Sequence, residues 1–347
     1  MAIRLGINGF GRIGRQVARI AAGLTNIDLV AINDRADSET NAHLFKYDTT
    51  YGPFKGRVSV NNDELVIDGD HVKLISQADP AQIPWGDLGV DYVLESTGVF
   101  RRVEDCEKHL DGGAKYVLLS APAKDKMPTY CFGINHHNWV TDGRPQVISN
   151  ASCTTNCLAP MAHVLHNSFG IKKGLINTVH SYTNDQRLLD GGHKDLRRAR
   201  SAAANIIPTS TGAAKTIGLI IPDLDGKMDG LAVRVPTVSG SLCDLTCTLE
   251  KDVTVDEVHE AIQRSVDGEL DGILYLTHDP IVSTDIIQAE HSCIVDAQLT
   301  KVIGNNMVKM VGWYDNEWGY SVRCMDLIRY LVAENSKLNS TEGSTAG

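Results

Sequence analysis

The segment Ser149–Cys157, SNASCTTNC, places a cysteine among small hydroxyl and amide residues. Cys153 stands between Ser152 and Thr154, at the point where an apolar helical pattern begins. A thiol at a helix N-terminus is stabilised as its thiolate by the helix dipole, and the thiolate is a strong nucleophile. The cysteines of the chain lack the paired spacing of a structural zinc site, so no metal site is expected. The pattern predicts a presented, reactive thiol.

A nucleophilic thiol requires a base. The segment INTVHSYTNDQR offers His180 at the end of an apolar strand, before a polar loop. The sequence does not show that His180 meets Cys153, because a histidine after a strand can equally be a structural hydrogen-bonding group. Cys157 lies one helical turn after Cys153 and is interpreted as a small buried apolar residue.

Three later features could bind polar or anionic groups. The cationic run HKDLRRAR leads into 209–212, whose hydroxyl and backbone N–H groups suit an oxyanion or a phosphate. Arg234 stands inside an otherwise apolar strand, and a buried arginine requires an anionic partner, either a phosphate or a structural carboxylate. Asn316 precedes the last helix, where it either bonds a carboxamide or caps that helix.

The N-terminal part of the chain carries the signals of a dinucleotide-binding unit. An apolar run precedes Gly9, Gly11 and Gly14 in the spacing G-x-G-x-x-G, and an amphipathic helical pattern follows. Such glycines permit a tight turn, close approach of the backbone to a pyrophosphate, and close packing of helix on strand. The N–H groups at the start of that helix would face the phosphates.

An acidic residue follows the second strand of this unit, IDLVAIN. Asp34 stands where a carboxylate can accept hydrogen bonds from an adenosine ribose, which favours NAD. Arg35 comes directly after it and could meet a 2′-phosphate. NAD is therefore the expected cofactor, and NADP stays open as an alternative.

The bulk properties exclude several other classes of protein. A chain of 347 residues is long enough for two domains, and 42% apolar with 22% charged residues is typical of a soluble globular protein. The net charge of -10 weighs against nucleic acid as the main partner. Eight widely spaced cysteines indicate a reducing compartment. No signal peptide and no long apolar run is found, so we expect a cytoplasmic protein without a membrane partner.

Residues 2–335 closely resemble the phosphorylating glyceraldehyde-3-phosphate dehydrogenases. The matching motifs are long, specific and in order: INGFGRIGR, SNASCTTNCLAP, HSYTNDQR, HKDLRRARSAAANIIPTSTGAAK, AVRVPT and WYDNEWGYS. The resemblance implies an α/β fold, with an N-terminal Rossmann doubly wound parallel sheet and an α+β catalytic domain with a mixed or antiparallel sheet. It implies the following layout: 1–152 NAD-binding domain, 153–318 catalytic domain, and 319–335 a helix packing back on the first domain. Residues 336–347 lie beyond the resemblance, and their small polar composition predicts a disordered tail.

The resemblance also implies a reaction and a homotetramer. Cys153 would attack the aldehyde of glyceraldehyde 3-phosphate, and His180 would act as the base. Hydride would pass to NAD and leave a thioester, which inorganic phosphate would convert to 1,3-bisphosphoglycerate. The family's substrate-binding positions correspond here to Ser152, Thr154, Thr183, Arg198, Thr211, Gly212 and Arg234. Its cofactor-binding positions correspond to Gly9, Gly11, Arg12, Ile13, Gly14, Asp34, Ala78, Ser96, Thr97, Ser120 and Asn316.

Two departures and three alternatives remain. Strictly NAD-dependent members commonly carry Leu-Pro where this chain has Gly191-Gly192, which together with Arg35 weakens the usual barrier to NADP. An erythrose-4-phosphate dehydrogenase would share the cysteine and histidine but differ in the phosphate loops, which are intact here. A non-phosphorylating aldehyde dehydrogenase would work without phosphate. A non-catalytic dinucleotide- or RNA-binding scaffold would not need Cys153 and His180.

Overall fold

The computed structural model describes residues 2–344 and divides the chain into two compact units. The first unit holds the residues up to 132, residues 136–151 and the chain from residue 321 on. The second holds residues 133–135 and 152–320. The chain thus passes from one unit to the other between Ala151 and Ser152, one residue before the predicted boundary.

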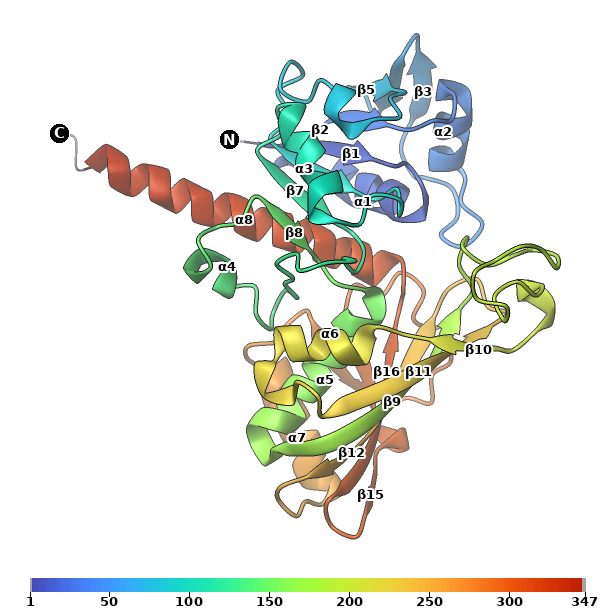
Figure 1. Ribbon diagram of the computed structural model, residues 1–347, viewed down its shortest axis with the longest axis vertical. Coiled ribbons are helices and arrows are strands. Elements are labelled where there is room, and N and C mark those ends of the chain that lie inside the picture. The colour runs from blue at the N-terminus through green and yellow to red at the C-terminus, as the bar shows by residue number, and fades with distance from the viewer. Residues whose placement is uncertain (1, 345–347) are drawn as a thin grey trace. The chain divides into compact units, whose positions relative to one another are not determined.

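The first unit is built on a doubly wound sheet (Figure 1). Its strand order is β3-β4-β5-β2-β1-β6-β7-β8, parallel from β5 to β8 with an antiparallel edge. The strands are β1 (Ile3–Asn8), β2 (Ile27–Asn33), β3 (Val58–Asn61), β4 (Glu64–Ile67), β5 (Asp70–Ile75), β6 (Tyr92–Glu95), β7 (Tyr116–Leu119) and β8 (Val147–Ser149). The helices are α1 (Arg12–Ala22), α2 (Ser38–Lys46), α3 (Val103–Asp111) and α4 (Asn138–Thr141).

The order of this sheet locates a ligand cleft. The chain adds strands on one side of β1 and then returns with β6 on the other side. Ligands of open α/β sheets bind at the carboxyl ends of the strands where the order reverses. The glycine-rich segment follows β1 and the segment Ser96–Thr97 follows β6, so the predicted cofactor residues flank this switch point.

The second unit is a mixed sheet with helices packed against it (Figure 1). Its order is β10-β11-β9-β12-β16-β14-β13, with β15 paired to β16. The strands are β9 (Ile171–Ser181), β10 (Ile207–Ser210), β11 (Met228–Val235), β12 (Ser241–Leu249), β13 (Leu274–Thr277), β14 (Cys293–Asp296), β15 (Lys301–Ile303) and β16 (Met307–Tyr314). The helices are α5 (Cys153–Phe169), α6 (Ala213–Ile220) and α7 (Val255–Val266), and short 3-10 helices are η1 (Pro80–Gln82), η2 (Ala202–Ala204), η3 (Pro222–Leu224) and η4 (Ala297–Leu299).

Helix α5 forms the centre of this unit's core. It packs on α6 and α7 and on strands β12, β14 and β16. Most of its residues are buried, which explains why the sequence of α5 is apolar almost all round. Strand β12 alternates buried and half-buried residues along its length, as expected for a strand with one face on this core.

The last helix, α8 (Trp318–Ser344), is longer than predicted. Met325 and Ile328 lie on its buried face. The helix continues to Ser344, so the predicted end at 335 and the predicted disorder are wrong up to that residue. Residues 345–347 lie outside the described part of the chain.

Candidate active site

Cys153 is the first residue of helix α5, as predicted. Ser152 caps the helix, because its side-chain oxygen accepts the backbone N–H of Thr155 at 3.0 Å. The cap fixes where the helix begins and therefore where the thiol points. Cys153 is only partly buried, whereas the other seven cysteines are buried. It is the presented thiol that the sequence predicted.

His180 meets Cys153. Its Nε2 lies 3.4 Å from the sulfur. His180 is the last residue but one of strand β9. Nδ1 lies 2.7 Å from the carbonyl oxygen of Ser181, which can only accept a hydrogen bond. This contact assigns the ring proton to Nδ1 and leaves the lone pair of Nε2 directed at the thiol. The geometry is that of a base beside a nucleophile.

Burial determines the charges of this pair. Burial, followed by the nearby cation of Arg234, lowers the pKa of His180 to about 3, so the imidazole is neutral at neutral pH. Burial also raises the pKa of the Cys153 thiol, while Arg234 and the backbone N–H of Thr154 oppose that rise. Burial is the largest of these influences, and it opposes the thiolate that the start of the helix favours. The resting pair is a thiol and a neutral base.

Arg234 lies beside His180 on the neighbouring strand β11, where the two residues are register partners. Its Nη1 lies 3.1 Å from His180 Nδ1 and donates to the Ser181 carbonyl and the Thr183 hydroxyl, each at 3.0 Å. Among residues 2–344 no carboxylate forms an ion pair with it, and its buried Nε has no partner. A half-buried guanidinium with an unused, buried donor can receive an anion.

Asp185 was not predicted from the sequence. It bonds Arg198 directly and is linked to Arg234 through the Thr183 hydroxyl. It accepts hydrogen bonds from the Thr183 hydroxyl and from Arg198 Nη1, the latter at 2.6 Å. Burial opposes its ionisation, but Thr183, Arg198 and Arg234 together hold the pKa of Asp185 below its usual value. Arg198 also donates to the Thr209 hydroxyl at 2.9 Å. The cationic run thus contributes one arginine to the site, and this arginine already has a carboxylate partner.

The hydroxyls beside Cys153 make hydrogen bonds within the protein. The Thr154 hydroxyl is buried and lies 2.8 Å from that of Tyr314, which also bonds Thr178 at 2.8 Å. The Ser152 hydroxyl caps α5. These contacts give both side chains a structural role, because a side chain this deep must satisfy its polar atoms within the protein. Tyr314 was missed as a site residue, although it lies inside the motif WYDNEWGYS.

Thr211 and Gly212 form the start of helix α6. The Thr211 hydroxyl accepts the N–H of Ala213 at 3.2 Å, and Gly212 occupies the cap position without a side-chain cap. The space where a side chain at 212 would stand is empty to 4 Å. Exposed N–H groups at a helix start suit an anion, in agreement with the predicted loop.

The three glycines of the first unit have separate structural reasons. Gly9 has φ +93°, and a Cβ there would lie 2.6 Å from the Thr97 nitrogen. A Cβ at Gly14 would lie 2.2 Å from the Gly9 carbonyl oxygen, so Gly14 lets α1 pack on the loop. A Cβ at Gly11 would touch nothing within 4 Å, and α1 has no side-chain cap. Only Gly11 thus leaves open space at the helix start, as a pyrophosphate requires.

Other predicted cofactor residues lie around the same loop. The Asp34 carboxylate accepts the N–H groups of Phe10 at 2.7 Å and Ala36 at 2.9 Å. The Arg12 side chain is paired with Asp48 at 2.5 Å. The half-buried Asp34 keeps further acceptor sites for a ribose.

One buried residue, Glu95, bonds to the segments that follow β6 and β7. Glu95 accepts the N–H and hydroxyl of Thr97, and its carbonyl accepts the Ser120 hydroxyl at 3.0 Å. The Ser96 hydroxyl donates to the Gly9 carbonyl at 2.7 Å. Ala78 is exposed after β5. The predicted serines and threonine therefore shape the edge of the sheet, and Glu95 is a further residue that the sequence did not single out.

Asn316 does not cap the last helix. Asp315 does so, because its carboxylate accepts the N–H groups of Glu317 and Trp318, each at 2.9 Å. The Asn316 side-chain oxygen instead accepts the Ser241 hydroxyl at 2.9 Å. This bond orients the side-chain amide, whose NH₂ group remains able to donate to a carboxamide.

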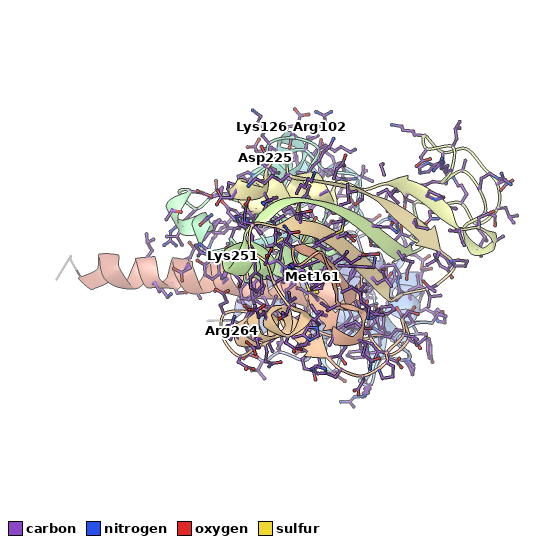
Figure 2. The ribbon with its side chains drawn as sticks, turned by 90° about the horizontal axis from the view of Figure 1, so that it is seen from below. Arg102, Lys126, Met161, Asp225, Lys251 and Arg264 are labelled. Atoms are coloured by element: carbon purple, nitrogen blue, oxygen red, sulfur yellow. The ribbon has the colours of Figure 1, made fainter. Side chains whose placement is uncertain are left out.

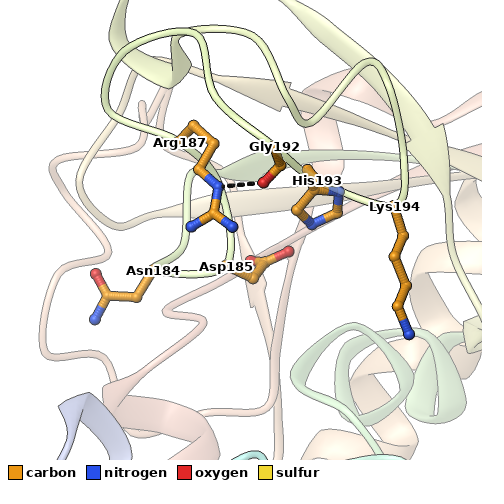
Figure 3. A pocket seen from close by; sticks show the side chains of 6 residues that line it. All are labelled: Asn184, Asp185, Arg187, Gly192, His193 and Lys194. Carbon is orange, nitrogen blue, oxygen red and sulfur yellow. Dashed lines mark hydrogen bonds between the residues drawn. The ribbon is translucent and has the colours of Figure 1, made fainter.

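An open pocket of about 680 Å³ lies in the loop after β9 (Figure 3). Polar and charged residues line it: Asn184, Asp185, Arg187, Gly192, His193 and Lys194. Arg187 Nε donates to the Gly192 carbonyl at 2.7 Å and closes the loop on itself. Cys153 does not line this pocket, so the reacting thiol is elsewhere and Asp185 is the residue common to both regions.

Within residues 2–344, no group of three or more histidine, cysteine or acidic side chains is placed to hold a metal ion. In the same part of the chain, no helix combines the length and apolar character needed to cross a bilayer.

Two family models match the chain. Residues 3–103 match the glyceraldehyde 3-phosphate dehydrogenase NAD binding domain, and residues 152–316 match the C-terminal domain of the same family. The first match contains the glycine loop and Asp34, and the second contains Cys153 and His180.

Curated relatives are similar along nearly the whole chain. A glyceraldehyde-3-phosphate dehydrogenase of Streptomyces coelicolor is 55% identical over 95% of this chain and 99% of its own length. One of Geobacillus stearothermophilus is 52% identical over 96% of the chain and 99% of its own length. One of Neurospora crassa is 50% identical over 97% and 99%, respectively.

Proposed function

Because the chain belongs to the glyceraldehyde-3-phosphate dehydrogenase family, we propose that it oxidises D-glyceraldehyde 3-phosphate to 1,3-bisphosphoglycerate with NAD and inorganic phosphate. The observation that carries this proposal is the pair of Cys153 and His180, with 3.4 Å between sulfur and Nε2. The neutral imidazole can accept a proton from the thiol, and Arg234 stands beside it with an unpaired Nε.

The residues after β1 fit NAD. Gly11 leaves space at the uncapped start of α1, and Asp34 keeps acceptor sites for the adenosine ribose. Backbone groups of Arg12 and Ile13 would bind the pyrophosphate, and the oriented amide of Asn316 would bind the nicotinamide carboxamide. When bound, NAD supplies a hydride acceptor.

The chain's own groups then carry the proton and acyl transfers. His180 Nε2 accepts the thiol proton as the sulfur attacks the aldehyde carbon, and the imidazolium returns that proton to the alkoxide to give a hemithioacetal. The freed Nε2 next accepts the hydroxyl proton during oxidation, which leaves a thioester on Cys153. Phosphate attack on the thioester releases the product and restores the sulfur. The Nδ1–H bond to the Ser181 carbonyl keeps Nε2 directed at the reacting atoms throughout.

Two anions must bind, since one phosphate belongs to the substrate and another attacks. Arg234 and Thr183 form one candidate site, supported by the unpaired Arg234 Nε. Thr211 and Gly212 form the other, supported by the uncapped start of α6. Arg198 lies near both through Asp185 and Thr209. The Ser152 hydroxyl accepts the cap bond and the Thr154 hydroxyl bonds Tyr314, but a hydroxyl has one donor and two acceptor sites, so both stay candidate ligands of the attacking phosphate.

The test is an assay of NADH formation with glyceraldehyde 3-phosphate, with and without inorganic phosphate. We expect sustained turnover only with phosphate. Turnover that is independent of phosphate would favour a hydrolytic aldehyde dehydrogenase, and faster turnover of erythrose 4-phosphate would change the substrate. A Cys153→Ser variant should lose turnover and bind NAD almost as the parent does. Turnover by that variant would contradict the covalent mechanism.

NADP use is the second question about the cofactor. Asp34 would repel a 2′-phosphate, whereas exposed Arg35 could attract it. We propose NAD as the preferred cofactor. A comparison of kcat/KM for the two cofactors tests this, and a ratio near one would overturn the preference. Absence of any rate with NADP would remove dual use.

We also propose a homotetramer in the cytoplasm. Three leucines in the loop between β9 and β10, Leu188, Leu189 and Leu196, are 76–81% exposed, and apolar side chains presented together favour an interface. The eight cysteines, all within the described residues, form no disulfide, which suits a reducing compartment.

A further inference from the structure

A buried carboxylate lies at the carboxyl end of strand β6 in the first unit. The Glu95 side chain has no exposed surface and accepts four hydrogen bonds. Its Oε1 accepts the backbone N–H of Thr97 at 2.8 Å and the Thr97 hydroxyl at 2.5 Å. Its Oε2 accepts Asn8 Nδ2 at 2.6 Å and His109 Nε2 at 3.1 Å. A buried carboxylate is stable only where donors replace the water that it loses, so these four bonds are needed.

One series of hydrogen bonds reaches Glu95 from helix α3. His109 stands on that helix, which follows Arg102, labelled in Figure 2. The indole N–H of Trp85 lies 3.0 Å from His109 Nδ1 and can only donate, so Nδ1 is an acceptor. His109 is therefore neutral and carries its proton on Nε2, which donates to Glu95. Trp85 and His109 have no exposed surface, so the imidazole is oriented from both sides.

A second series reaches Glu95 from the segment after strand β5. The backbone N–H of Gln77 can only donate, and it lies 2.8 Å from Asn33 Oδ1, which must be the oxygen of that amide. Asn33 Nδ2 then donates to Asn8 Oδ1 at 2.7 Å and to the Gln77 carbonyl at 2.9 Å. Asn8 Nδ2 is left to donate to Glu95. Each amide thus has one orientation that satisfies its neighbours.

Both series begin at a group that can only donate, and both end on the same carboxylate. Of the partners of Glu95, the backbone of Thr97, the Asn8 amide and His109 Nε2 are all donors in this arrangement. The site therefore fits an ionised carboxylate, which only accepts. Asn8 Nδ2 and His109 Nε2 lie 3.4 Å apart because both are directed at the same oxygen.

The two series connect the segments that carry the predicted cofactor residues. Asn8 is the last register partner of both Asn33 and Glu95, so these side chains meet where strands β2, β1 and β6 end. Gln77 precedes Ala78 in the segment after β5, which is the next strand of the sheet. Past these last pairs the backbone ladders end, and side chains hold the segments that follow.

We propose that Glu95 and His109 are positioning residues for the dinucleotide. The carboxylate, oriented by the imidazole, holds the loops after β1, β2, β5 and β6 at the spacing that NAD requires. Neither side chain is exposed, so both act through Asn8, Asn33 and Thr97. Without the imidazole, Oε2 keeps one donor, and the carboxylate must move to find another together with the groups bonded to it. The inference rests on the proposed binding of NAD along these loops.

The test compares two substitutions of the same histidine in the full-length protein. His109→Leu removes both bonds of the imidazole and should raise the Kd and the KM for NAD about tenfold, as expected for a lost buried bond to a charged group. The kcat at saturating NAD should change little, because Cys153 and His180 belong to the other unit. His109→Gln keeps an NH₂ group that can donate to Glu95 and an oxygen that can accept from Trp85, so it should bind NAD nearly as the parent does.

Trp139→Phe is the matched control for lost stability. Trp139 is also fully buried in the first unit, and its indole donates to the Pro145 carbonyl at 3.0 Å, outside both series. This variant should melt at a lower temperature and keep the parental NAD affinity. Thermal denaturation without cofactor and titration calorimetry with NAD measure the two quantities.

Parental NAD affinity in His109→Leu, or an equal loss of affinity in His109→Gln or Trp139→Phe, would overturn the inference and leave the proposed function standing. A parent protein that binds no NAD would overturn both. If His109→Leu does not fold, Asn33→Ala breaks the second series and decides by the same separation of KM from kcat.

Discussion

At the scale of single residues, the reactivity of Cys153 results from opposing influences. Burial favours the thiol, whereas Arg234 and the N–H groups at the start of α5 favour the thiolate. Burial and Arg234 act in the same direction on His180 and keep it neutral. A neutral base beside a thiol allows the proton to move when the substrate arrives, without a resting ion pair in the site.

The influence of Arg234 can be measured through the thiol. Arg234→Gln removes the cation that lowers the pKa of Cys153, so that pKa should rise and alkylation at neutral pH should slow, about tenfold for each unit of the rise. The pH profile of iodoacetamide alkylation measures the shift. Arg197→Gln removes an exposed arginine from the loop between β9 and β10 and should leave the profile unchanged. A profile that does not move in Arg234→Gln would show that the cation has no effect on the sulfur.

His180→Asn tests the base. We expect kcat to fall by about 10²–10⁴-fold with little change in NAD affinity, because general bases contribute factors of this order. Stability gives a second readout. The pKa of His180 is about 3 in the folded protein, whereas an unfolded histidine binds a proton below about 6.5. The parent should therefore lose stability as pH falls from about 6.5 to 3, and the variant should lose less. Equal pH dependence of urea unfolding in the two proteins would contradict the assignment.

At the scale of elements, the glycines of the loop between β1 and α1 have different roles: one is needed for packing and another for ligand binding. Gly14 is required because α1 approaches the loop so closely that a Cβ would collide with the Gly9 carbonyl. Gly11 has an ordinary φ of −75° and open space beside it, so the fold does not require a glycine there. Only a ligand at the helix start gives a reason for Gly11.

Two matched alanine variants follow from this difference. Gly14→Ala should lower the unfolding free energy by about 1–3 kcal/mol, because the methyl group collides with backbone that cannot move away. Gly11→Ala should leave the melting temperature nearly unchanged and weaken NAD binding. Thermal denaturation without cofactor and titration calorimetry with NAD measure the two effects. A Gly11→Ala variant with parental NAD affinity would argue against a pyrophosphate at the start of α1.

At the scale of the whole molecule, the two units contribute different chemistry. The first carries the groups that fit a dinucleotide at the switch point of its sheet, and the second carries Cys153, His180 and Arg234 within one unit. Cys153 and His180 are thus held by a single core of α5 and β9. Their distance depends on that core alone.

Substitution of a leucine in the loop between β9 and β10 tests the proposed homotetramer. We expect light scattering to give four times the mass of one chain for the parent protein. Leu189→Asp should give a smaller mass, because a carboxylate at an apolar interface loses its hydration. Ile303→Asp changes a similarly exposed side chain on β15 and should keep the parental mass. A parent that is monomeric, or a Leu189→Asp variant with parental mass, would contradict the proposed interface.

Local pattern was sufficient for much of this protein. Glycine spacing predicted the turn after β1, apolar periodicity predicted α1 and α5, and ordered motifs predicted the family. The position of Asn316 left two alternatives open, because a cap depends on which of two adjacent polar residues turns toward the helix. The end of α8 was predicted too early, because polar residues after 335 resemble a tail as much as an exposed helix.

The sequence by itself determined the order of elements, the Rossmann glycines, and the identities of the thiol, the histidine and the buried arginine. Tertiary structure alone decided that Nε2 faces the sulfur and that no carboxylate of residues 2–344 forms an ion pair with Arg234. The physical reason is that burial and contacts between distant segments set these properties. Local spacing encodes the backbone, but it does not encode how much water a buried atom loses or which distant atom replaces that water.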